Sequence, residues 1–245
     1  MLPLCWYAPD AIEVLNAAVL SYSPAIYWKK TEYLLERGLQ VHAVVVFVDV
    51  ADIQDEAAAY RIDPEGRVVG APDPPFDLIY TWTRNSLTYR ALTDASQWLW
   101  PHPPLGGCRI ASPNYPCRVG WTLSRSAMDS YGRAGLERAD THMSRLAALL
   151  RRHGIPLTLA VYPWPQHLLW NDRPSLQVGH WQEWSTREGV RFVELFSAFF
   201  AEADAIGVRD TIARYFIPGD VHWSALGHRL VAERFARHFV PPVSR

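Results

Sequence analysis

The sequence of 245 residues has no excess charge of either sign and no long apolar run. Its 24 Lys and Arg against 25 Asp and Glu leave a formal net charge of −1, which gives no general reason to bind nucleic acid or an anionic membrane surface. No apolar stretch approaches the roughly 20 residues that a membrane-spanning helix needs. The opening MLPLCWYAPDAIEV lacks the basic start and apolar core of a signal peptide, so the cytoplasm is the default compartment.

Cysteine is scarce and odd in number, which argues against a disulfide-rich scaffold. The three cysteines are Cys5, Cys108 and Cys117. The last two flank a short loop and would pair if the chain were exported; unpaired, they are small buried groups. Tryptophan is abundant instead, with 11 residues. Two interpretations of the tryptophans are open: packing in the core and loops, or stacking against sugar rings in a cleft.

Strand-like and helix-like segments alternate along the chain, which is typical of an α/β domain with a mostly parallel sheet and helices on both faces. Apolar runs rich in β-branched residues predict buried strands. These runs are HAVVVFVDV (42–50), IPLTLAVYPWP (155–165) and VRFVELF (190–196), with a shorter strand expected in IEVLNAAVL, from Ile12 to Leu20. The predicted helices are SPAIYWKKTEYLLERG with Ser23 as N-cap and Gly38 at its end, GLERADTHMSRLAALLRRHG, SLQVGHWQEWSTREG, and Ser224–Phe239 with Leu226, Leu230, Phe235 and Phe239 facing inward.

A single domain over residues 1–245 is expected. Periodicity is poor and prolines and tryptophans are frequent at about 72–131, which predicts a loop-rich insertion with one helix near Ser86–Leu99. Just before it, YRIDPEGRVVG predicts two short strands joined by a turn at Asp63–Gly66.

The segment IPGDVHWSALGHRLVAERF, which begins at Ile217, carries the most informative functional pattern. Asp220 and His222 are two residues apart, so in an extended chain they point to the same side. The acid would accept a hydrogen bond from one ring nitrogen and leave the other as a base, although a purely structural hydrogen bond is an alternative. Ser224 is interpreted as a helix N-cap rather than a nucleophile. The six-residue offset of His228 from His222 does not resemble the usual spacing of metal ligands.

This ending resembles the last motif of the SGNH (GDSL-type) hydrolases, in a subgroup with an Asp-x-His-Trp ending similar to polysaccharide acetyltransferases and esterases. Four segments resemble sequence motifs of that subgroup: VLNAAVLSYSPAIYW, VVVFVDVADIQDE, LAVYPWP and YFIPGDVHW. The resemblance covers roughly Ile12 to Phe239. It implies a flavodoxin-like three-layer sandwich and a Ser-His-Asp triad in which His222 is the base and Asp220 its partner. It also implies small-molecule or carbohydrate acyl esters as substrates, and no metal or other cofactor.

The chain departs from the family at the positions that stabilise and attack the acyl group. The family's nucleophile lies in a Gly-Asp-Ser block after the first strand, and no Gly-Asp-Ser occurs in this sequence. Ala18 stands where a glycine would supply an oxyanion-hole amide, and its N–H would still donate. Ala51 stands where an asparagine would supply a side-chain donor. Asp49 and Asp52 flank it, and ionised carboxylates there would repel a developing oxyanion.

The resemblance therefore implies that the strand carrying the nucleophile is missing. Ser21 and Ser23 are the only serines near the expected cleft edge, and Ser23 already has a capping role. In a flavodoxin-like sheet the missing strand would lie between Ile12–Leu15 and Ala43–Val48, and each backbone group left buried and unpaired costs about 1–3 kcal/mol. We expect a natural start upstream of Met1, and an open slot rather than direct pairing between these two strands.

Three functional hypotheses follow. The first is an SGNH-type serine esterase or acyl-transfer enzyme that is N-terminally truncated and almost inactive as given. The second is a non-catalytic carbohydrate-binding relative with a cleft lined by tryptophans, namely Trp82, Trp164, Trp170 and Trp223. The third is a metal-dependent enzyme that uses Asp49, Asp52, Asp220, His222 and His228.

Overall fold

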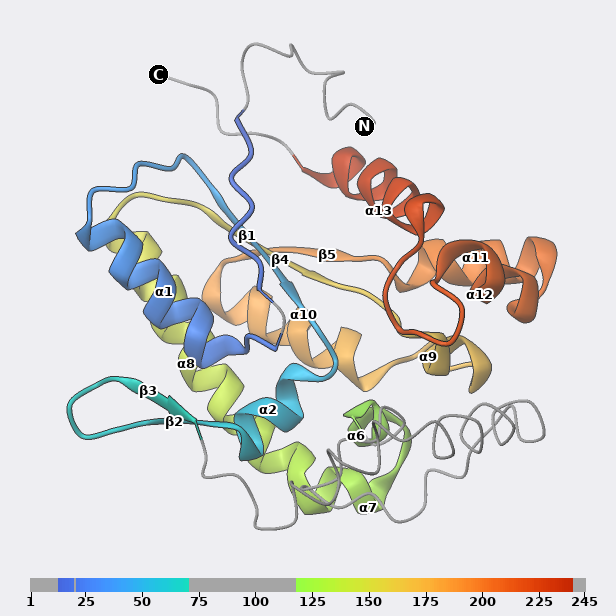
Figure 1. The fold of residues 1–245 in the computed structure, drawn as a ribbon, viewed down its shortest axis with the longest axis horizontal. Coiled ribbons are helices and arrows are strands. Elements are labelled where there is room, and N and C mark those ends of the chain that lie inside the picture. Colours follow the sequence, from blue (N-terminus) through green and yellow to red (C-terminus); the bar gives the residue numbers. More distant parts are fainter. Residues whose placement is uncertain (1–12, 20, 71–117, 240–245) are drawn as a thin grey trace, which may run out of the picture.

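A three-stranded parallel sheet forms the centre of the protein (Figure 1). A computed structural model describes residues 13–19, 21–70 and 118–239. The strands β1 (Val44–Val48), β4 (Leu157–Val161) and β5 (Arg191–Glu194) lie in the order β1-β4-β5. β4 pairs with a neighbour on each side, and all five of its residues are buried. Three of the predicted strands and the parallel arrangement are thereby confirmed.

Helices cover both faces of this sheet, an arrangement compatible with a three-layer α/β sandwich. Figure 1 shows α1 (Pro24–Glu36) and α8 (Arg133–Arg152) on one side of the strands and α13 (Ala225–His238) on the other. Side chains alternate along β1, so Phe47 faces α13, where its ring lies 5.4 Å from that of Phe235. Val46 and Val48 point to the opposite face and are buried.

The helices on the first face are joined by polar contacts as well as by apolar packing. Glu56, in α2 (Asp52–Ala58), is fully buried. Its carboxylate accepts hydrogen bonds from the Ser23 hydroxyl at 2.8 Å and the Ala25 amide at 2.6 Å, and lies 2.8 Å from the Nδ1 atom of His142 in α8. Ser23 is therefore the N-cap residue of α1, as predicted, but its hydroxyl donates to Glu56 instead of capping the helix.

The remaining predicted helix ends agree with the structure. Gly38 follows α1 with a φ of +86°, a conformation that favours glycine. α10 (Leu176–Glu188) begins after Ser175, whose hydroxyl accepts from the Gln177 amide, and ends at the left-handed Gly189. The predicted hairpin is also present, as the antiparallel strands β2 (Tyr60–Ile62) and β3 (Val68–Gly70).

The predicted strand at Ile12–Leu15 is wrong for the residues that the structure describes. Residues 13–19 form no strand, and Val14 and Leu15 are 67% and 54% exposed. Among the described strands, β1 pairs only with β4, so residues 13–19 do not pair directly with it. A short apolar segment forms a strand only when a neighbour bonds its backbone, and no described strand does so here.

The boundary of the predicted insertion is also corrected. Residues 120–132 form α6 (Gly120–Leu123), α7 (Arg125–Ala127) and a π-helical turn, η2 (Met128–Gly132), with the extended residue Ser124 between α6 and α7. Trp121 is fully buried there, and its indole N–H donates to the Val50 carbonyl at 2.8 Å. This stretch therefore belongs to the core. The predicted helix at Ser86–Leu99, the tryptophan Trp82 and the three cysteines lie outside the described residues.

Besides α6, α7 and η2, four further described helices had no counterpart in the sequence-based prediction: α2, α9 (Pro165–Leu169), α11 (Phe196–Ile206) and α12 (Val208–Tyr215). In α13 the inward positions are right for Leu230 and Phe235, which are buried, but wrong for Leu226, which is 42% exposed. No helix in the described ranges is both long enough and apolar enough to cross a membrane.

The contact between α8 and α2 generates a test of this packing. A Cβ atom on Gly135 would lie 2.0 Å from the Ile53 carbonyl oxygen, so Gly135→Ala must push the two helices apart. We expect a loss of about 1–3 kcal/mol in the free energy of unfolding, measured by urea denaturation. Gly179→Ala in α10 is the matched control, because nothing lies within 4 Å of its new methyl group. That change should be neutral or stabilise by up to about 1 kcal/mol, and equal losses in both variants would contradict the packing.

Candidate functional site

The Asp-Val-His-Trp segment forms a tight loop between α12 and α13. Phe216 and Trp223 make an isolated antiparallel bridge, and the Ile217 amide donates to the His222 carbonyl at 2.9 Å. The turn is completed by a hydrogen bond from the Asp220 amide to the Ile217 carbonyl at 3.0 Å. Gly219 within it has a φ of +73°, which explains a glycine at this place.

Asp220 and His222 are hydrogen-bonded within this loop. The Nδ1 atom of His222 lies 2.6 Å from Oδ1 of Asp220, as the spacing predicts. The same oxygen accepts from the backbone amides of Val221 at 2.6 Å and His222 at 3.3 Å. Partial burial opposes ionisation of Asp220, but the bonds from the His222 ring and the two amides outweigh it and lower the pKa of the carboxyl. Asp220 is thus held as an anion against the imidazole.

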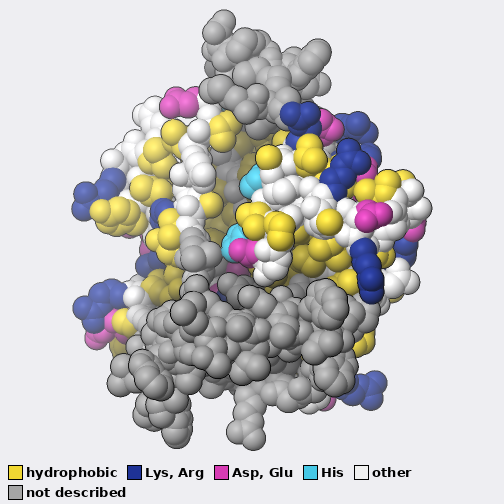
Figure 2. All heavy atoms as spheres, turned by 45° about the vertical axis from the view of Figure 1, so that its right-hand side comes forward, with side chains coloured by type: hydrophobic (Ala, Val, Ile, Leu, Met, Phe, Trp, Pro, Cys, Tyr) yellow, Lys and Arg dark blue, Asp and Glu magenta, His cyan; other side chains and the backbone are white. Residues whose placement is uncertain are grey.

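An ionised Asp220 determines which nitrogen of His222 carries the proton. Because a carboxylate only accepts, Nδ1 is the protonated nitrogen and Nε2 keeps its lone pair. The His222 side chain is 53% exposed, so Nε2 is within reach of a ligand. On the face drawn in Figure 2, histidine side chains in cyan line one wall of a furrow, with an acidic side chain in magenta beside one of them.

Trp223 attaches the loop to the carboxyl end of the sheet. Its ring centroid lies 4.6 Å from that of Tyr162, the residue that follows β4, and 6.4 Å from that of Phe47 in β1. On its other side His228 packs edge-on at 5.3 Å. The loop therefore rests on the ends of β1 and β4 through Trp223. Sites in parallel α/β sheets form at this end of the strands.

The start of α13 packs against the residues that precede the loop. The Ser224 hydroxyl accepts from the Gly227 amide at 3.2 Å and donates to the Arg214 carbonyl at 2.7 Å, so Ser224 is the N-cap, as predicted. A Cβ atom on Gly227 would lie 2.1 Å from the Tyr215 carbonyl oxygen. The helix approaches the chain before the loop so closely that only glycine fits there.

Two carboxyl groups follow β1 and face different surroundings. Asp49 accepts hydrogen bonds from the Tyr162 hydroxyl, from the Trp164 indole N–H at 3.0 Å and from the Ala51 amide at 2.7 Å. Its carboxylate therefore connects the end of β1 to the segment after β4. Three donors on one carboxylate are typical of an anion held in place.

Asp52 is buried beside this anion. Its Oδ2 atom accepts from the Asp49 amide at 2.9 Å and lies 2.8 Å from the Tyr27 hydroxyl. Burial, followed by repulsion from Asp49, raises the pKa of Asp52 well above its usual value. Burial and Asp52 together raise the pKa of Tyr27 in the same direction. Asp52 is thus a carboxyl group that keeps its proton to a higher pH than usual, whereas the sequence led us to treat both carboxyls as ionised.

The backbone amides of Ala18, the expected oxyanion donor, and of Ala51, which replaces the asparagine donor of the family, both have partners within the chain. The Ala18 amide donates to the Asn16 side chain at 3.0 Å, and the Ala51 amide donates to Asp49. Of the two serines expected at the cleft edge, Ser23 is bound to Glu56. Ser21 is exposed and has a φ of +62°, which is unusual for a residue other than glycine, and its carbonyl accepts from the Tyr60 hydroxyl at 2.6 Å.

The described tryptophans that were expected to line a cleft differ in how exposed they are. Trp164 is buried with its indole N–H on Asp49, so it belongs to the framework and lines no open cleft. Trp223 is partly buried against Tyr162, and Trp170, after α9, is 44% exposed. The prediction missed Tyr162 and Tyr27. The signal for Tyr162 was available in LAVYPWP, where an aromatic hydroxyl directly follows a buried strand.

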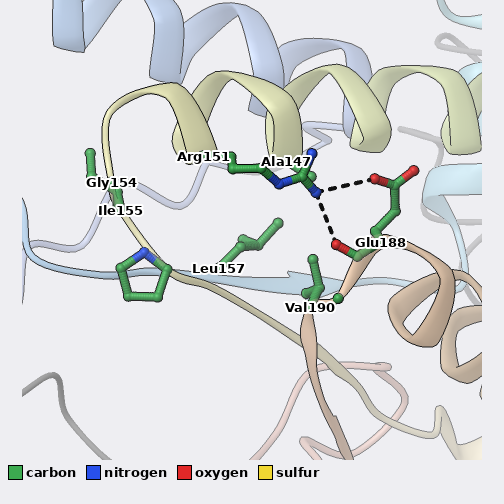
Figure 3. Close-up of a pocket in the computed structure, with 9 residues that line it drawn as sticks. Ala147, Arg151, Gly154, Ile155, Leu157, Glu188 and Val190 are labelled. Carbon is green, nitrogen blue, oxygen red and sulfur yellow. Dashed lines mark hydrogen bonds and ion pairs between the residues drawn. The ribbon is translucent and has the colours of Figure 1, made fainter.

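A hollow of about 280 Å³ lies at the opposite end of the sheet (Figure 3). It is lined by the ends of α8 and α10 and by the residues that lead into β4 and β5. Arg151 reaches across it and donates to the Glu188 carbonyl at 2.9 Å. Because it lies at the amino ends of the strands, it is separate from the Asp220–His222 loop.

No protein-family model, curated protein or solved structure matches the chain. Within residues 13–19, 21–70 and 118–239, no three His, Cys, Asp or Glu side chains are placed to hold a metal ion together. The acids Asp49 and Asp52 thus do not converge with Asp220, His222 and His228 on a shared metal position.

The raised pKa of Asp52 predicts a pH dependence of stability. The unfolded chain loses this proton at lower pH than the folded chain, so Asp52 costs stability progressively as pH rises from its unfolded pKa through its folded pKa. Asp52→Asn should therefore raise the free energy of unfolding at pH 8 and change it by less than about 0.5 kcal/mol at pH 4, measured by urea denaturation.

The matched control is Asp63, for which we expect the opposite dependence of stability on pH. Hydrogen bonds from the Arg67 backbone, more than from its side chain, lower the pKa of the partly buried Asp63. Asp63→Asn should therefore lower stability at neutral pH and lose that effect as pH falls. A loss of stability at pH 8 in Asp52→Asn would show that Asp52 is ionised in the folded protein.

Proposed function

We propose that this chain is an SGNH-type ester hydrolase or acyl transferase in which His222 is the base and Asp220 orients it. The observation that carries the proposal is the 2.6 Å contact between Asp220 Oδ1 and His222 Nδ1, on an exposed loop at the carboxyl end of a parallel sheet. The strand order β1-β4-β5, which follows the chain order, supports a flavodoxin-like three-layer sandwich. Both features are those that the family resemblance implies.

The chemistry is acyl transfer through a serine ester. Nε2 of His222 would take the proton of a serine hydroxyl as the oxygen attacks the acyl carbon, and Asp220 would stabilise the resulting imidazolium without taking the proton. The imidazolium would then protonate the leaving alkoxide as the tetrahedral intermediate collapses. Water or a sugar hydroxyl, deprotonated by His222 in turn, would cleave the acyl-serine and release the serine.

The serine itself is not assigned among the described residues. The hydroxyls of Ser23 and Ser224 are committed to Glu56 and to the start of α13. Ser21 is the serine to test first, because it is exposed and its backbone is held in a left-handed conformation. The family resemblance places the nucleophile in a Gly-Asp-Ser block instead, which this sequence does not contain.

A carbohydrate-binding relative without catalysis is the second candidate. Exposed Trp170, near the carboxyl end of β4, is the observation that favours it, because an exposed indole can stack on a sugar ring. Burial of Trp164 removes one of the aromatic surfaces on which this candidate depended.

Hydrolysis of p-nitrophenyl acetate tests the proposal. The chain as given should show negligible turnover, because the base has no assigned nucleophile and loss of one triad member typically lowers kcat by about 10⁴–10⁶-fold. Any in-frame coding sequence upstream of Met1 that supplies a strand followed by Gly-Asp-Ser should restore turnover, and His222→Ala should abolish it. His228→Ala is the matched histidine control and should retain most of the activity.

Two outcomes would count against the enzyme. The first is turnover that survives His222→Ala. The second is the absence of any upstream Gly-Asp-Ser together with an inactive chain, which would favour the carbohydrate-binding relative. Turnover by the chain as given that is lost in Ser21→Ala would support the enzyme and assign Ser21 as its nucleophile.

A further inference from the structure

We propose that Asp49 is a positioning residue for the His222 base and acts through Tyr162 and Trp223. The catalytic role of Asp49 rests on the proposed function, whereas the contacts that link Asp49 to the His222 loop do not depend on it. Asp49 comes from the end of β1 and the His222 loop precedes α13, so the two are far apart in the sequence. Two aromatic side chains connect them.

The first connection is the bond between Asp49 and Tyr162. The Tyr162 hydroxyl donates to Oδ2 of Asp49, which also accepts from the Trp164 indole. Burial, followed by the Asp49 charge, raises the pKa of Tyr162 well above its usual value, so the phenol stays a donor. Hydrogen bonds to a charged partner are stronger than those between neutral groups, so the bond from Tyr162 restricts where its ring lies, while the bond from Trp164 holds the Asp49 carboxylate.

The second connection is the contact between Tyr162 and Trp223. The ring centroids are 4.6 Å apart at an interplanar angle of 64°, close to the edge-to-face geometry that aromatic pairs favour. Trp223 directly follows His222 and is bridged to Phe216 across the loop. A shift of the Tyr162 ring must therefore be passed to the residue next to the base.

Asp49 is not required to hold the strands together. β1 and β4 are already paired along five residues, from Val44 with Leu157 to Val48 with Val161. The Asp49 side chain joins the segments just beyond this ladder, where backbone pairing has ended. Its bonds therefore fix side-chain positions at the candidate site rather than the register of the sheet.

The test uses NMR of the chain as it exists. In Asp49→Ala, nuclear Overhauser contacts between the Tyr162 ring and the Trp223 indole should weaken, and the side-chain signals of Trp223 and His222 should shift. Tyr162→Phe removes the hydroxyl that joins the ring to Asp49 and should shift the same signals in the same direction. Asp49→Asn keeps one oxygen that can accept from Tyr162 and should restore most of the contacts.

Asp140→Ala is the matched control. Asp140 in α8 also binds two side chains, with His180 Nε2 at 2.7 Å and Arg187 at 3.3 Å, but on another part of the fold. Unchanged contacts in Asp49→Ala, or equal shifts in Asp140→Ala, would overturn the proposal. If Asp49→Ala does not fold, the Trp223 and His222 signals of Tyr162→Phe and Asp49→Asn test the proposal instead.

An acyl-transferring form of the protein adds a kinetic test. Asp49→Ala should lower kcat about 10–100-fold and leave KM nearly unchanged, since the substrate contacts are intact and the base is displaced. Asp49→Asn should recover most of kcat. Normal kcat in Asp49→Ala would overturn the positioning role. If a form that carries an upstream strand and Gly-Asp-Ser transfers no acyl group, the proposed function is refuted and the NMR result still stands.

Discussion

The parallel pairing of three short strands is the constraint on which the candidate site depends. The pairing register places Val48 beside Val161, and Val161 beside Glu194, so β1, β4 and β5 all end at one edge. The residues that follow β1 and β4, Asp49 and Tyr162, are thereby brought together although 113 positions separate them. The last loop reaches the same edge because Trp223 packs on Tyr162.

Several polar groups at this edge are hydrogen-bonded to one another. The Asp49 carboxylate accepts three hydrogen bonds. The carboxyl group of Asp52 is buried beside it, accepts a hydrogen bond from the Asp49 amide and contacts the Tyr27 hydroxyl. Two neighbouring carboxyls with different surroundings are expected to differ in protonation, as repulsion between them opposes a second charge. Burial of Asp52 lowers the stability of the folded chain. Such destabilising groups are common in active sites, so its burial is consistent with a site at this edge.

Elements encoded by a local pattern could be predicted from the sequence, and those that depend on distant partners could not. Strands β1, β4 and β5 are apolar runs whose burial is encoded locally, and Ser175, Gly189 and Ser224 end or begin helices by local chemistry. The segment 13–19 has the same apolar pattern as a strand but lacks a bonding neighbour, which no local pattern reveals. Residues 120–132 lack periodicity, yet Trp121 and Tyr131 are buried through contacts with distant residues. Likewise, spacing predicted the Asp220–His222 bond, but only the fold shows that Ala18 and Ala51 have other partners.

The central claim is that Asp220 orients His222 and leaves Nε2 free as a base. The most direct measurement is the ¹⁵N NMR spectrum of the His222 side chain at a pH where the imidazole is neutral, in the wild type and in Asp220→Ala. The account predicts a single tautomer with the proton on Nδ1 in the wild type and a mixture of tautomers once the carboxylate is removed. A wild-type proton on Nε2, or the same tautomer in both proteins, would contradict it.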